Sequence, residues 1–303
     1  LHIDAQDLAD GVIQGGSGND TAIVGGGAGV ELNLADHGLE NAVGGAQNDV
    51  LRGRRVGESV TLSGGAGDDN LLGSSHDDHL VGGAGDDFFK AGDGADTIQG
   101  GPGDDRIIAG AGEDVIHGGA GHDHLSGRDG ADKIVGGEGA DRLSGNAGAD
   151  TLLGGQGDDQ LNIDAADVDS GSVDGGDGTD VAKLVGAQGV EIDLAATNME
   201  LARGSSGGDQ IDGSGLDAAT DIRGREGDDT IRGGSGDDDL RGEAGKDIIH
   251  GNAGDDRIQG GVRNDELSGG AGDDTIRGEA GDDVVRGGPG DDELLGLDGD
   301  DTL

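Results

Sequence analysis

The stretch from Gly64 to Ile108 reads GGAGDDNLL, GSSHDDHLV, GGAGDDFFK, AGDGADTIQ and GGPGDDRII, five units of nine residues in one unbroken frame. The frame continues to Asn162, which gives eleven consecutive units, and a second run from Gly224 to Leu303 gives nine more, the last one residue short. Position six is Asp and position eight is Leu, Ile, Val or Phe in all twenty units, and position four is Gly in eighteen. Such a register indicates a repeat architecture rather than an ordinary globular core.

The spacing within a unit predicts six turn residues followed by a three-residue strand. Glycine at the turn positions permits positive φ, and alternation along the strand sends position eight inward and positions seven and nine outward. Each unit reverses the chain once, so two consecutive units form one coil, twice nine residues long. Stacked coils then form two parallel sheets, with neighbouring strands about 4.8 Å apart, over a thin aliphatic core. The predicted fold is an all-β parallel β-roll.

Composition narrows the classes of function. Glycine supplies 72 of 303 residues, aromatic residues supply 1 %, and the formal net charge is −46. This charge excludes a nucleic-acid binder that works through a basic face. No apolar stretch approaches the roughly 18 residues of a membrane span, and no N-terminal signal pattern is visible. Because the chain contains no Cys, disulfides, thiolate metal sites and a cysteine nucleophile are also excluded.

The aspartates at position six fall into two columns. Units n and n+2 lie on the same side of the coil stack, so Asp69 lies above Asp87 and Asp87 above Asp105, while Asp78 and Asp96 line the other edge. Carboxylates about 5 Å apart repel one another unless something lies between them. Backbone carbonyls of the glycine turns point into the same space, and oxygen ligands without nitrogen or sulfur suit Ca²⁺ better than Mg²⁺. The sequence therefore predicts rows of calcium sites.

The units resemble the nonapeptide G-G-x-G-x-D-x-U-x of the RTX (hemolysin-type) calcium-binding repeats, and the resemblance covers residues 64–162 and 224–303. It implies a calcium-filled, right-handed β-solenoid, with two rolls separated by irregular β segments. Pairing unit n with unit n+2 allows nine sites in the first run and seven in the second, at most 16 Ca²⁺. His76 and Arg263 replace the glycine at position four, so their turns are expected to be weak or vacant sites. The implied metal ligands are Asp69, Asp78, Asp87, Asp96, Asp105, Asp114, Asp123, Asp132, Asp141, Asp150, Asp159, Asp229, Asp238, Asp247, Asp256, Asp265, Asp274, Asp283, Asp292 and Asp301.

The irregular segments repeat as well. The segment that begins at Gly15 resembles the one that begins at Gly175, and this offset of 160 carries residues 1–143 onto 161–303 without a gap. We therefore expect four parts in the chain. They are an irregular β segment at 1–63, a β-roll at 64–162, a second irregular segment at 163–223 that duplicates 3–63, and a second β-roll at 224–303.

Each irregular segment contains one clear strand signal, VELNL at 30–34 and VEIDL at 190–194, in which apolar and polar residues alternate. In the RTX family similar inserts flank or cap the solenoid, whose ends need cover for unpaired strand groups. Four further aspartates lie in single turns like those of the nonapeptide and are additional candidate calcium ligands: Asp20, Asp49, Asp180 and Asp209.

Other chemistry has little support in the sequence. His117, His122 and His124 form the tightest histidine group, but they occupy positions nine, five and seven of the repeat, which are solvent-facing or variable. The glycines at 25–29 have no following Lys-Ser/Thr, as a phosphate-binding loop would require. Positions five and seven lack the regular rank of Thr or Asn that ice binding needs. No catalytic residue is predicted, and the chain is not expected to be an enzyme. A carbohydrate contact stays open, with Phe88 as the one outward aromatic candidate.

The resemblance implies a calcium-binding repeat region of a secreted bacterial protein, which is exported unfolded by type I secretion machinery and folds on Ca²⁺ outside the cell. Two alternatives to this interpretation remain open. In the first, the chain is a structural or adhesive spacer rod of a cell-surface protein. In the second, it is an accessory region of a secreted toxin or enzyme whose active domain lies elsewhere. Leu1 and Leu303 both occupy position eight, so both ends cut through a repeat. We therefore expect this chain to be a piece of a longer protein.

Overall fold

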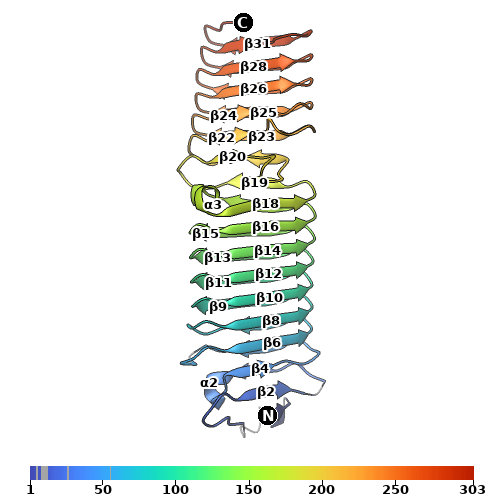
Figure 1. The fold of residues 1–303 in the computed structure, drawn as a ribbon, viewed down its shortest axis with the longest axis vertical. Helices are drawn as coiled ribbons and strands as arrows, with labels where there is room; N and C mark the ends of the chain where they lie inside the picture. Colours follow the sequence, from blue (N-terminus) through green and yellow to red (C-terminus); the bar gives the residue numbers. More distant parts are fainter. Residues whose placement is uncertain (5, 8–12, 26, 55) are drawn as a thin grey trace. The chain divides into compact units, whose positions relative to one another are not determined.

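The computed structural model describes residues 1–4, 6–7, 13–25, 27–54 and 56–303. The chain forms two compact units, Leu1–Asp159 and Gln160–Leu303. Within each unit it winds into stacked coils, and strands from successive coils lie side by side in parallel sheets (Figure 1). The prediction of an all-β fold with parallel sheets is confirmed.

The first unit contains two parallel sheets and a short helix, α2 (Leu34–His37). The first sheet contains β1 (His2–Ile3), β2 (Thr21–Val24), β4 (Asn41–Val43), β6 (Thr61–Ala66), β8 (His79–Ala84), β10 (Thr97–Pro102), β12 (Val115–Ala120), β14 (Lys133–Glu138) and β16 (Thr151–Gln156). The second contains β3 (Glu31–Asn33), β5 (Val50–Arg52), β7 (Asn70–Leu72), β9 (Phe88–Asp93), β11 (Arg106–Ala111), β13 (His124–Asp129) and β15 (Arg142–Ala147).

The second unit repeats this plan, and helix α3 (Ala165–Ser170) and strand β18 (Ser172–Asp177) lie near its start. One sheet contains β17 (Gln160–Ile163), β19 (Val181–Leu184), β21 (Leu201–Arg203), β23 (Asp221–Glu226), β25 (Asp239–Ala244), β27 (Arg257–Val262), β29 (Thr275–Ala280) and β31 (Glu293–Asp298). The other contains β20 (Glu191–Asp193), β22 (Gln210–Asp212), β24 (Thr230–Arg232), β26 (Ile248–Ala253), β28 (Glu266–Ala271) and β30 (Val284–Arg286).

The register of the nonapeptide runs is two units per coil, since Ile98 pairs with Ile116 and Ile116 with Ile134. The stacking also extends into the irregular segments. There Ala22 pairs with Ala42 and β3 pairs with β5, so these coils are longer than two nonapeptides. Many strands of the second unit follow strands of the first at the offset of 160, as β19 follows β2 and β20 follows β3, which matches the duplication seen in the sequence.

The strands are longer than the sequence pattern suggested. Most span six residues rather than three, as in β10, which joins positions seven to nine of one unit to positions one to three of the next. The ladder continues through glycine, for example from Gly101 to Gly119. A Cβ on Gly101 would lie 2.0 Å from the carbonyl oxygen of Gly83 in the preceding coil. The missing side chain therefore lets the coils approach closely, and the true turn shrinks to positions four to six.

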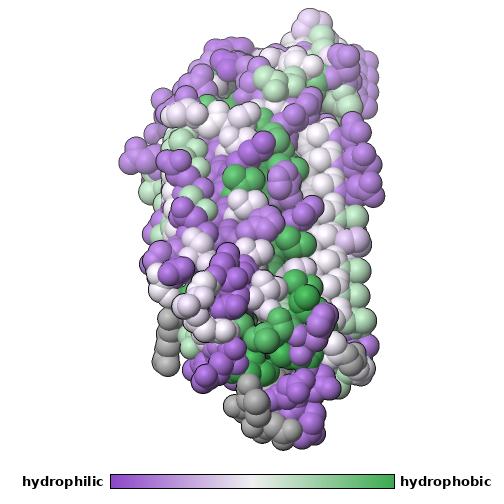
Figure 2. All heavy atoms as spheres, turned by 60° about the horizontal axis from the view of Figure 1, so that its bottom comes forward, coloured by the Kyte–Doolittle hydropathy of each residue, from purple (hydrophilic) through white to green (hydrophobic). Residues whose placement is uncertain are grey.

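The core is a single ladder of position-eight side chains. They are buried from Leu71 to Leu161 and from Ile231 to Val285, whereas Leu294 is half-buried and Leu303 is exposed. On the face shown in Figure 2, hydrophilic and near-neutral residues cover most of the surface, with smaller hydrophobic patches between them. Such a thin core supplies little apolar burial for a chain of this length.

Truncating one rung of this ladder is expected to be costly. Ile116 is fully buried between its neighbours in β10 and β14, so Ile116→Ala should lower the free energy of unfolding by about 2–4 kcal/mol. Val135→Ala, at the outward position nine of β14, should lower it by less than about 1 kcal/mol. Urea unfolding in saturating calcium measures both changes, and equal losses would contradict the inward assignment of position eight.

Candidate metal centre

Each position-six Asp closes a turn and directly precedes a strand. Asp105, for example, stands before Arg106, the first residue of β11. These aspartates are buried from Asp69 to Asp159 and from Asp229 to Asp283, whereas Asp292 and Asp301 are half-buried. The fold therefore brings the predicted metal ligands of each unit into columns and removes most of them from solvent, without a neighbouring Lys or Arg for each.

One carboxylate oxygen of each Asp has a backbone partner. The backbone N–H of Asp87 donates to Oδ1 of Asp105 at 2.8 Å, and that of Asp105 donates to Oδ1 of Asp123 at 2.8 Å. The second column has the same pattern, from Asp96 to Asp114 at 2.8 Å. Each coil is thus joined to the next through a carboxylate one coil further along the chain.

The second oxygen, Oδ2, is the unusual atom. In most nonapeptide turns it is buried and has no hydrogen-bond partner among the described residues. An unpaired buried carboxylate oxygen is costly, so a missing positive partner is the simplest explanation of its repetition. The aspartates with such an oxygen are Asp69, Asp87, Asp96, Asp105, Asp114, Asp123, Asp132, Asp141, Asp229, Asp247, Asp256, Asp265, Asp274 and Asp283.

These oxygens face a cradle formed by glycine. A Cβ built on Gly100 would lie 2.2 Å from Oδ2 of Asp105 and 2.5 Å from the carbonyl oxygen of Gly118 in the next coil. The same pair of oxygens surrounds Gly136 and Gly251. A position-one glycine therefore leaves a small space between a carboxylate of its own turn and a carbonyl of the next.

Further carbonyls face the gap between coils at positions two and four. The carbonyl oxygen of Gly83 would lie 2.0 Å from a Cβ on Gly101, and that of Gly85 would lie 2.0 Å from a Cβ on Gly103. The atoms that border the gap are thus carboxylate and carbonyl oxygens. This set of hard donors fits a cation such as Ca²⁺ and does not fit a soft transition metal.

In the absence of a cation, burial favours the protonated form of these carboxyl groups over the ionised form. It raises the pKa of Asp105 to about 7. The hydrogen bond from the Asp87 backbone lowers that pKa in part, while the charges of Asp123 and Asp87 raise it again. The pKa values of Asp96 and Asp132 are also raised to about 7, with burial as the largest cause. A column of ionised aspartates is therefore unstable at neutral pH unless a cation compensates it.

Four turns differ from the others, and we call them the closed turns: residues 44–49, 73–78, 204–209 and 233–238. In each of them the position-two backbone N–H turns inward and donates to Oδ2 of the turn's own Asp. Ser74 donates to Asp78 at 2.5 Å, and Gly234 donates to Asp238 at 2.7 Å. The equivalent bonds in the other two closed turns are 2.7 Å for Gly45 to Asp49 and 2.6 Å for Ser205 to Asp209.

The closed turns are the first turns of their columns. The N–H that reaches Oδ1 of Asp78 comes from Val60, and the one that reaches Asp238 comes from Thr220. In the other nonapeptide turns, which we call the open turns, this donor is the backbone N–H of an Asp in the preceding coil. The backbone at position two also differs between the two kinds of turn. Gly101 and Gly119 of open turns have φ values of +126° and +131°, whereas Ser74 and Gly234 of closed turns are not among the described residues with positive φ.

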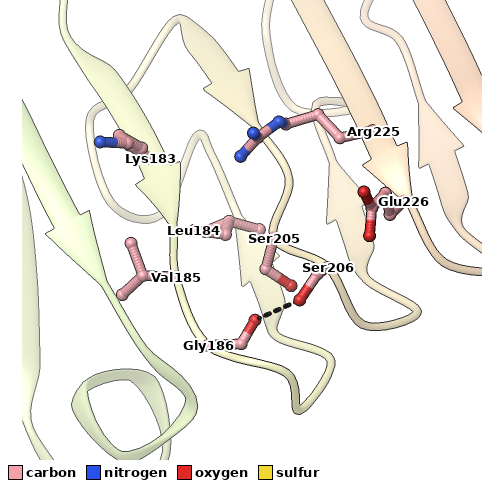
Figure 3. A pocket seen from close by; sticks show the side chains of 8 residues that line it. All are labelled: Lys183, Leu184, Val185, Gly186, Ser205, Ser206, Arg225 and Glu226. Carbon is pink, nitrogen blue, oxygen red and sulfur yellow. Dashed lines mark hydrogen bonds between the residues drawn. The ribbon is translucent and has the colours of Figure 1, made fainter.

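In the second unit the closed turns receive a further donor from the next coil. Arg225 donates from Nη1 to the carbonyl oxygen of Gly204 at 3.2 Å, and Asn252 donates from Nδ2 to that of Gly233 at 2.7 Å. Figure 3 shows Arg225 beside Ser205, together with the bond from Ser206 to Gly186. Arg225 and Asn252 have φ values of +81° and +79°, a conformation that disfavours side chains. In these two closed turns, side-chain donors therefore bond to position-one carbonyl oxygens, which in the open turns face the gap between coils.

The structure separates the two turns that were expected to be weak. The turn of His76 is closed, which supports that prediction without testing metal binding. The turn of Arg263 is open, with Oδ2 of Asp265 buried and unpaired among the described residues. Position four alone therefore does not determine the form of the turn.

Two acidic residues that we did not predict as ligands lie in the columns. Glu40 accepts the backbone N–H of Asp20 at 2.8 Å, and Glu200 accepts that of Asp180 at 2.7 Å. Each takes the place that an Asp has in the narrower coils. The sequence signal that could have identified these two residues is that Glu40 corresponds to Glu200 at the offset of 160.

The histidines do not form a site together. His117 lies on β12 and His124 on β13, in different sheets, while His122 accepts the backbone N–H of Ala140 through Nδ1 at 2.8 Å. Among the residues that the structure describes, no three His, Cys, Asp or Glu side chains gather as a metal cluster. Backbone carbonyls would therefore supply most ligands of any bound cation.

Comparison with known proteins gives one finding. A family model described as RTX calcium-binding nonapeptide repeat (4 copies) matches residues 61–89, 90–125, 126–161, 214–249, 223–258, 250–285 and 268–303, more than half of the chain. A search of curated proteins gave no match. In the described part of the chain, neither helix has the length and apolar character needed to cross a bilayer.

Proposed function

Because the chain belongs to the family of RTX calcium-binding nonapeptide repeat proteins, we propose that it is a region that folds as it binds calcium outside the cell that makes it. The observation that carries this proposal is the repeated buried Oδ2 without a partner among the described residues. Calcium supplies a divalent charge to hard oxygen ligands. The position-six aspartates and the carbonyls of their glycine turns would hold it.

Charge explains why binding and folding should be coupled. A chain with a net charge of −46 and 31 % hydrophobic residues has too little apolar burial to offset carboxylate repulsion. Each ion that neutralises two carboxylates removes this penalty for one pair of coils, and the ordered coil is a template for the next. The free energy of binding then becomes free energy of folding.

The closed turns set the upper limit on the number of ions. Of the sixteen pairs of nonapeptide turns, the pairs that begin with Asp78 and Asp238 contain a closed turn. Since a backbone N–H already satisfies Oδ2 there, we propose that these two pairs bind no calcium, which leaves at most fourteen. Asp49 and Asp209 are satisfied in the same way and are not proposed as ligands.

Secretion follows from the expected affinity. Extracellular calcium modules bind with dissociation constants of about 10⁻⁴–10⁻³ M, so the chain would stay unfolded at the low free calcium of the cytoplasm. An unfolded chain suits export by type I secretion machinery, and folding would follow in the medium. The ordered rows of carboxylates serve structure in this proposal, and no catalytic role is assigned to them.

Far-UV circular dichroism of the chain in EDTA, followed by titration with Ca²⁺, tests the proposal. We expect a cooperative change from coil to β signal at about millimolar calcium. Mg²⁺ should not produce it, because Mg²⁺ demands a tighter octahedron and keeps its waters. A full β signal already present in EDTA at neutral pH would contradict the proposal and favour a spacer that folds without metal.

A further inference from the structure

The few cations of the first roll are concentrated on one sheet. Between residues 64 and 159 the chain contains five Lys and Arg. Four of them lie on consecutive strands of the second sheet, Lys90 on β9, Arg106 on β11, Arg128 on β13 and Arg142 on β15, whereas Lys133 lies on β14 of the other sheet. The same strands also contain the exposed Asp93 and Asp129, so β9, β11, β13 and β15 together have four cations and two carboxylates in a chain with a net charge of −46.

All four of these cations are exposed. Positions seven and nine of β9, β11, β13 and β15 face outward and contain no acidic residue. We define the basic face as these outward residues with Arg128: Phe88, Lys90, Arg106, Ile108, His124, Ser126, Arg128, Arg142 and Ser144. Among the described residues, none of the four cations forms a salt bridge; the only ion pair in the first unit joins Arg52 to Glu31.

Register aligns Arg106 and Arg142 in one row at position seven, whereas Lys90 at position nine and Arg128 at position two lie beside that row. Arg106 pairs with Phe88 on one side and with His124 on the other, and His124 pairs with Arg142. Nη1 of Arg106 lies 3.1 Å from Nδ1 of His124. This contact joins the side chains of Arg106 and His124 across neighbouring strands of the sheet.

A groove runs beside this row. It has a volume of about 510 Å³, and its lining includes Lys90, Ile108 and Arg128, with Asp93 and Asp129 among its other residues. Arg128 has a φ of +94° at position two, where Gly92 and Gly110 of the same column have φ values of +140° and +148° and Asn146 has +78°. A side chain in this conformation is strained, and the fold offers no compensating ion pair for it among the described residues.

The duplicated unit shows that the fold does not require this face. At the offset of 160, Arg106 corresponds to Glu266 and Arg142 to Thr302, while Arg128 corresponds to Gly288. Several arginines of the second unit also have acidic partners, as in Arg286 with Glu266 at 2.7 Å and Arg241 with Asp239 at 2.6 Å. The same backbone therefore folds without the cations, so their presence in the first unit points to a ligand.

We propose that the basic face binds a linear acidic polysaccharide. Each of the four coils contributes one cation, and Arg106 and Arg142 stand in register two coils, about 9.6 Å, apart. This spacing suits an extended polymer whose carboxylates recur along a straight chain. Phe88 at one end of the row offers a ring for the apolar face of a sugar, and the hydroxyls of Ser126 and Ser144 offer hydrogen bonds to sugar hydroxyls. Nucleic acid fits less well, because its phosphates recur about every 1.7 Å along the duplex.

The proposal rests on the proposed function only in that the first unit must be folded. The test uses the whole chain in saturating calcium, with polygalacturonate chains too short for calcium to crosslink into a gel as the probe, dextran as a neutral polymer and single-stranded DNA as a second polyanion. Titration of each polymer into the same calcium buffer without protein is subtracted. Calorimetry measures affinity, and circular dichroism of the same samples reports folding. A chain that stays unfolded contradicts the proposed function and this face together, whereas a folded chain that does not bind polygalacturonate contradicts this face alone.

Variants that place the residues of the second unit at the equivalent positions of the first unit test whether the basic face is the binding surface. Arg106→Glu with Arg142→Thr should weaken polygalacturonate binding about tenfold or more, because two exposed charge contacts are lost and one is reversed. Arg257→Glu with Arg277→Thr, which changes the net charge by the same amount at exposed positions of the second unit, should leave the affinity within about twofold. Equal weakening by both variants would mean non-specific attraction. Equal binding of DNA by the unmodified chain would mean a general polyanion surface. Either result would overturn the proposal.

Discussion

The metal-free chain is expected to gain β structure when the pH is lowered from about 8 to about 5. Burial raises the pKa values of Asp69, Asp105, Asp229 and Asp265 to about 7 in the folded, metal-free state, against the ordinary value of 3.8 for Asp. Because these pKa values are raised on folding, the folded state binds more protons than the unfolded one. Its stability is then greatest below about pH 4 and falls as the pH rises through about 7.

The expected size of this effect is large. One pKa unit corresponds to about 1.4 kcal/mol, and several carboxyls of each column shift in the same direction, so the penalty at neutral pH is of the same order as the roughly 5–15 kcal/mol of stability of a typical domain. Protons at low pH and calcium at neutral pH thus relieve the same repulsion. Most acidic proteins with paired carboxylates would respond in the opposite direction and lose structure in acid.

Circular dichroism in EDTA across this pH range measures the change, with sedimentation at each pH to exclude aggregates near the pI of about 4.1. In saturating calcium the β signal should persist at pH 8. Calcium affinity should fall on acidification, because protons compete for the ligands. A loss of β signal on acidifying the EDTA sample would show that the carboxylates are stabilised without metal, which would contradict the buried, unpaired state of Oδ2.

Much of the fold was predictable because the side-chain pattern and the backbone share one period. Position eight must point inward in every coil, since a slip of one residue would place Ile116 or Leu125 in solvent. The same register places each Asp at a turn. The length of the strands was not predictable in this way, because Gly101 has no side chain to show whether it belongs to a ladder or to a turn.

The form of each turn depends on tertiary context that the local sequence does not contain. Residues 233–238 read GGSGDD and are closed, whereas residues 269–274 read GGAGDD and are open. The coil before Asp238 offers Thr220 as the donor, whereas the coil before Asp274 offers Asp256. A first turn has no preceding Asp turn with which to share a cation, and its own N–H group supplies the positive partner.

The basic face was missed for a related reason. Arg106, His124 and Arg142 are each separated by two full repeat units, so a count along the chain shows only scattered positive charges among many aspartates. In the coiled structure, successive coils bring these residues side by side in one row. Phe88 was correctly singled out as an outward aromatic candidate, and its register with Arg106 is what connects it to the charges.

Asp105→Asn and Asp238→Asn are expected to differ in their effect on the metal-free chain. Asn can keep the acceptor oxygen for the Asp87 N–H and removes the unpaired charge at Oδ2 of Asp105. The variant should therefore shift the midpoint of acid-induced folding in EDTA to higher pH. At Asp238 both oxygens accept backbone N–H groups, from Thr220 and Gly234. Burial also raises the pKa of Asp238, so an amide there removes an unfavourable charge but faces one donor with another, which costs about 1–3 kcal/mol. The midpoint should therefore rise less than in Asp105→Asn.

The same two variants should also differ in bound calcium, measured by equilibrium dialysis of the folded chain. Asp105 faces the coils of both Asp87 and Asp123, so its loss of charge should remove two ions. Asp238→Asn should remove none, because its turn is already closed by Gly234. Equal calcium losses in the two variants would show that closed and open turns bind alike. A lost ion in Asp238→Asn alone would reverse the assignment, since an N–H group donating to Oδ2 would then mark the occupied turn rather than the empty one.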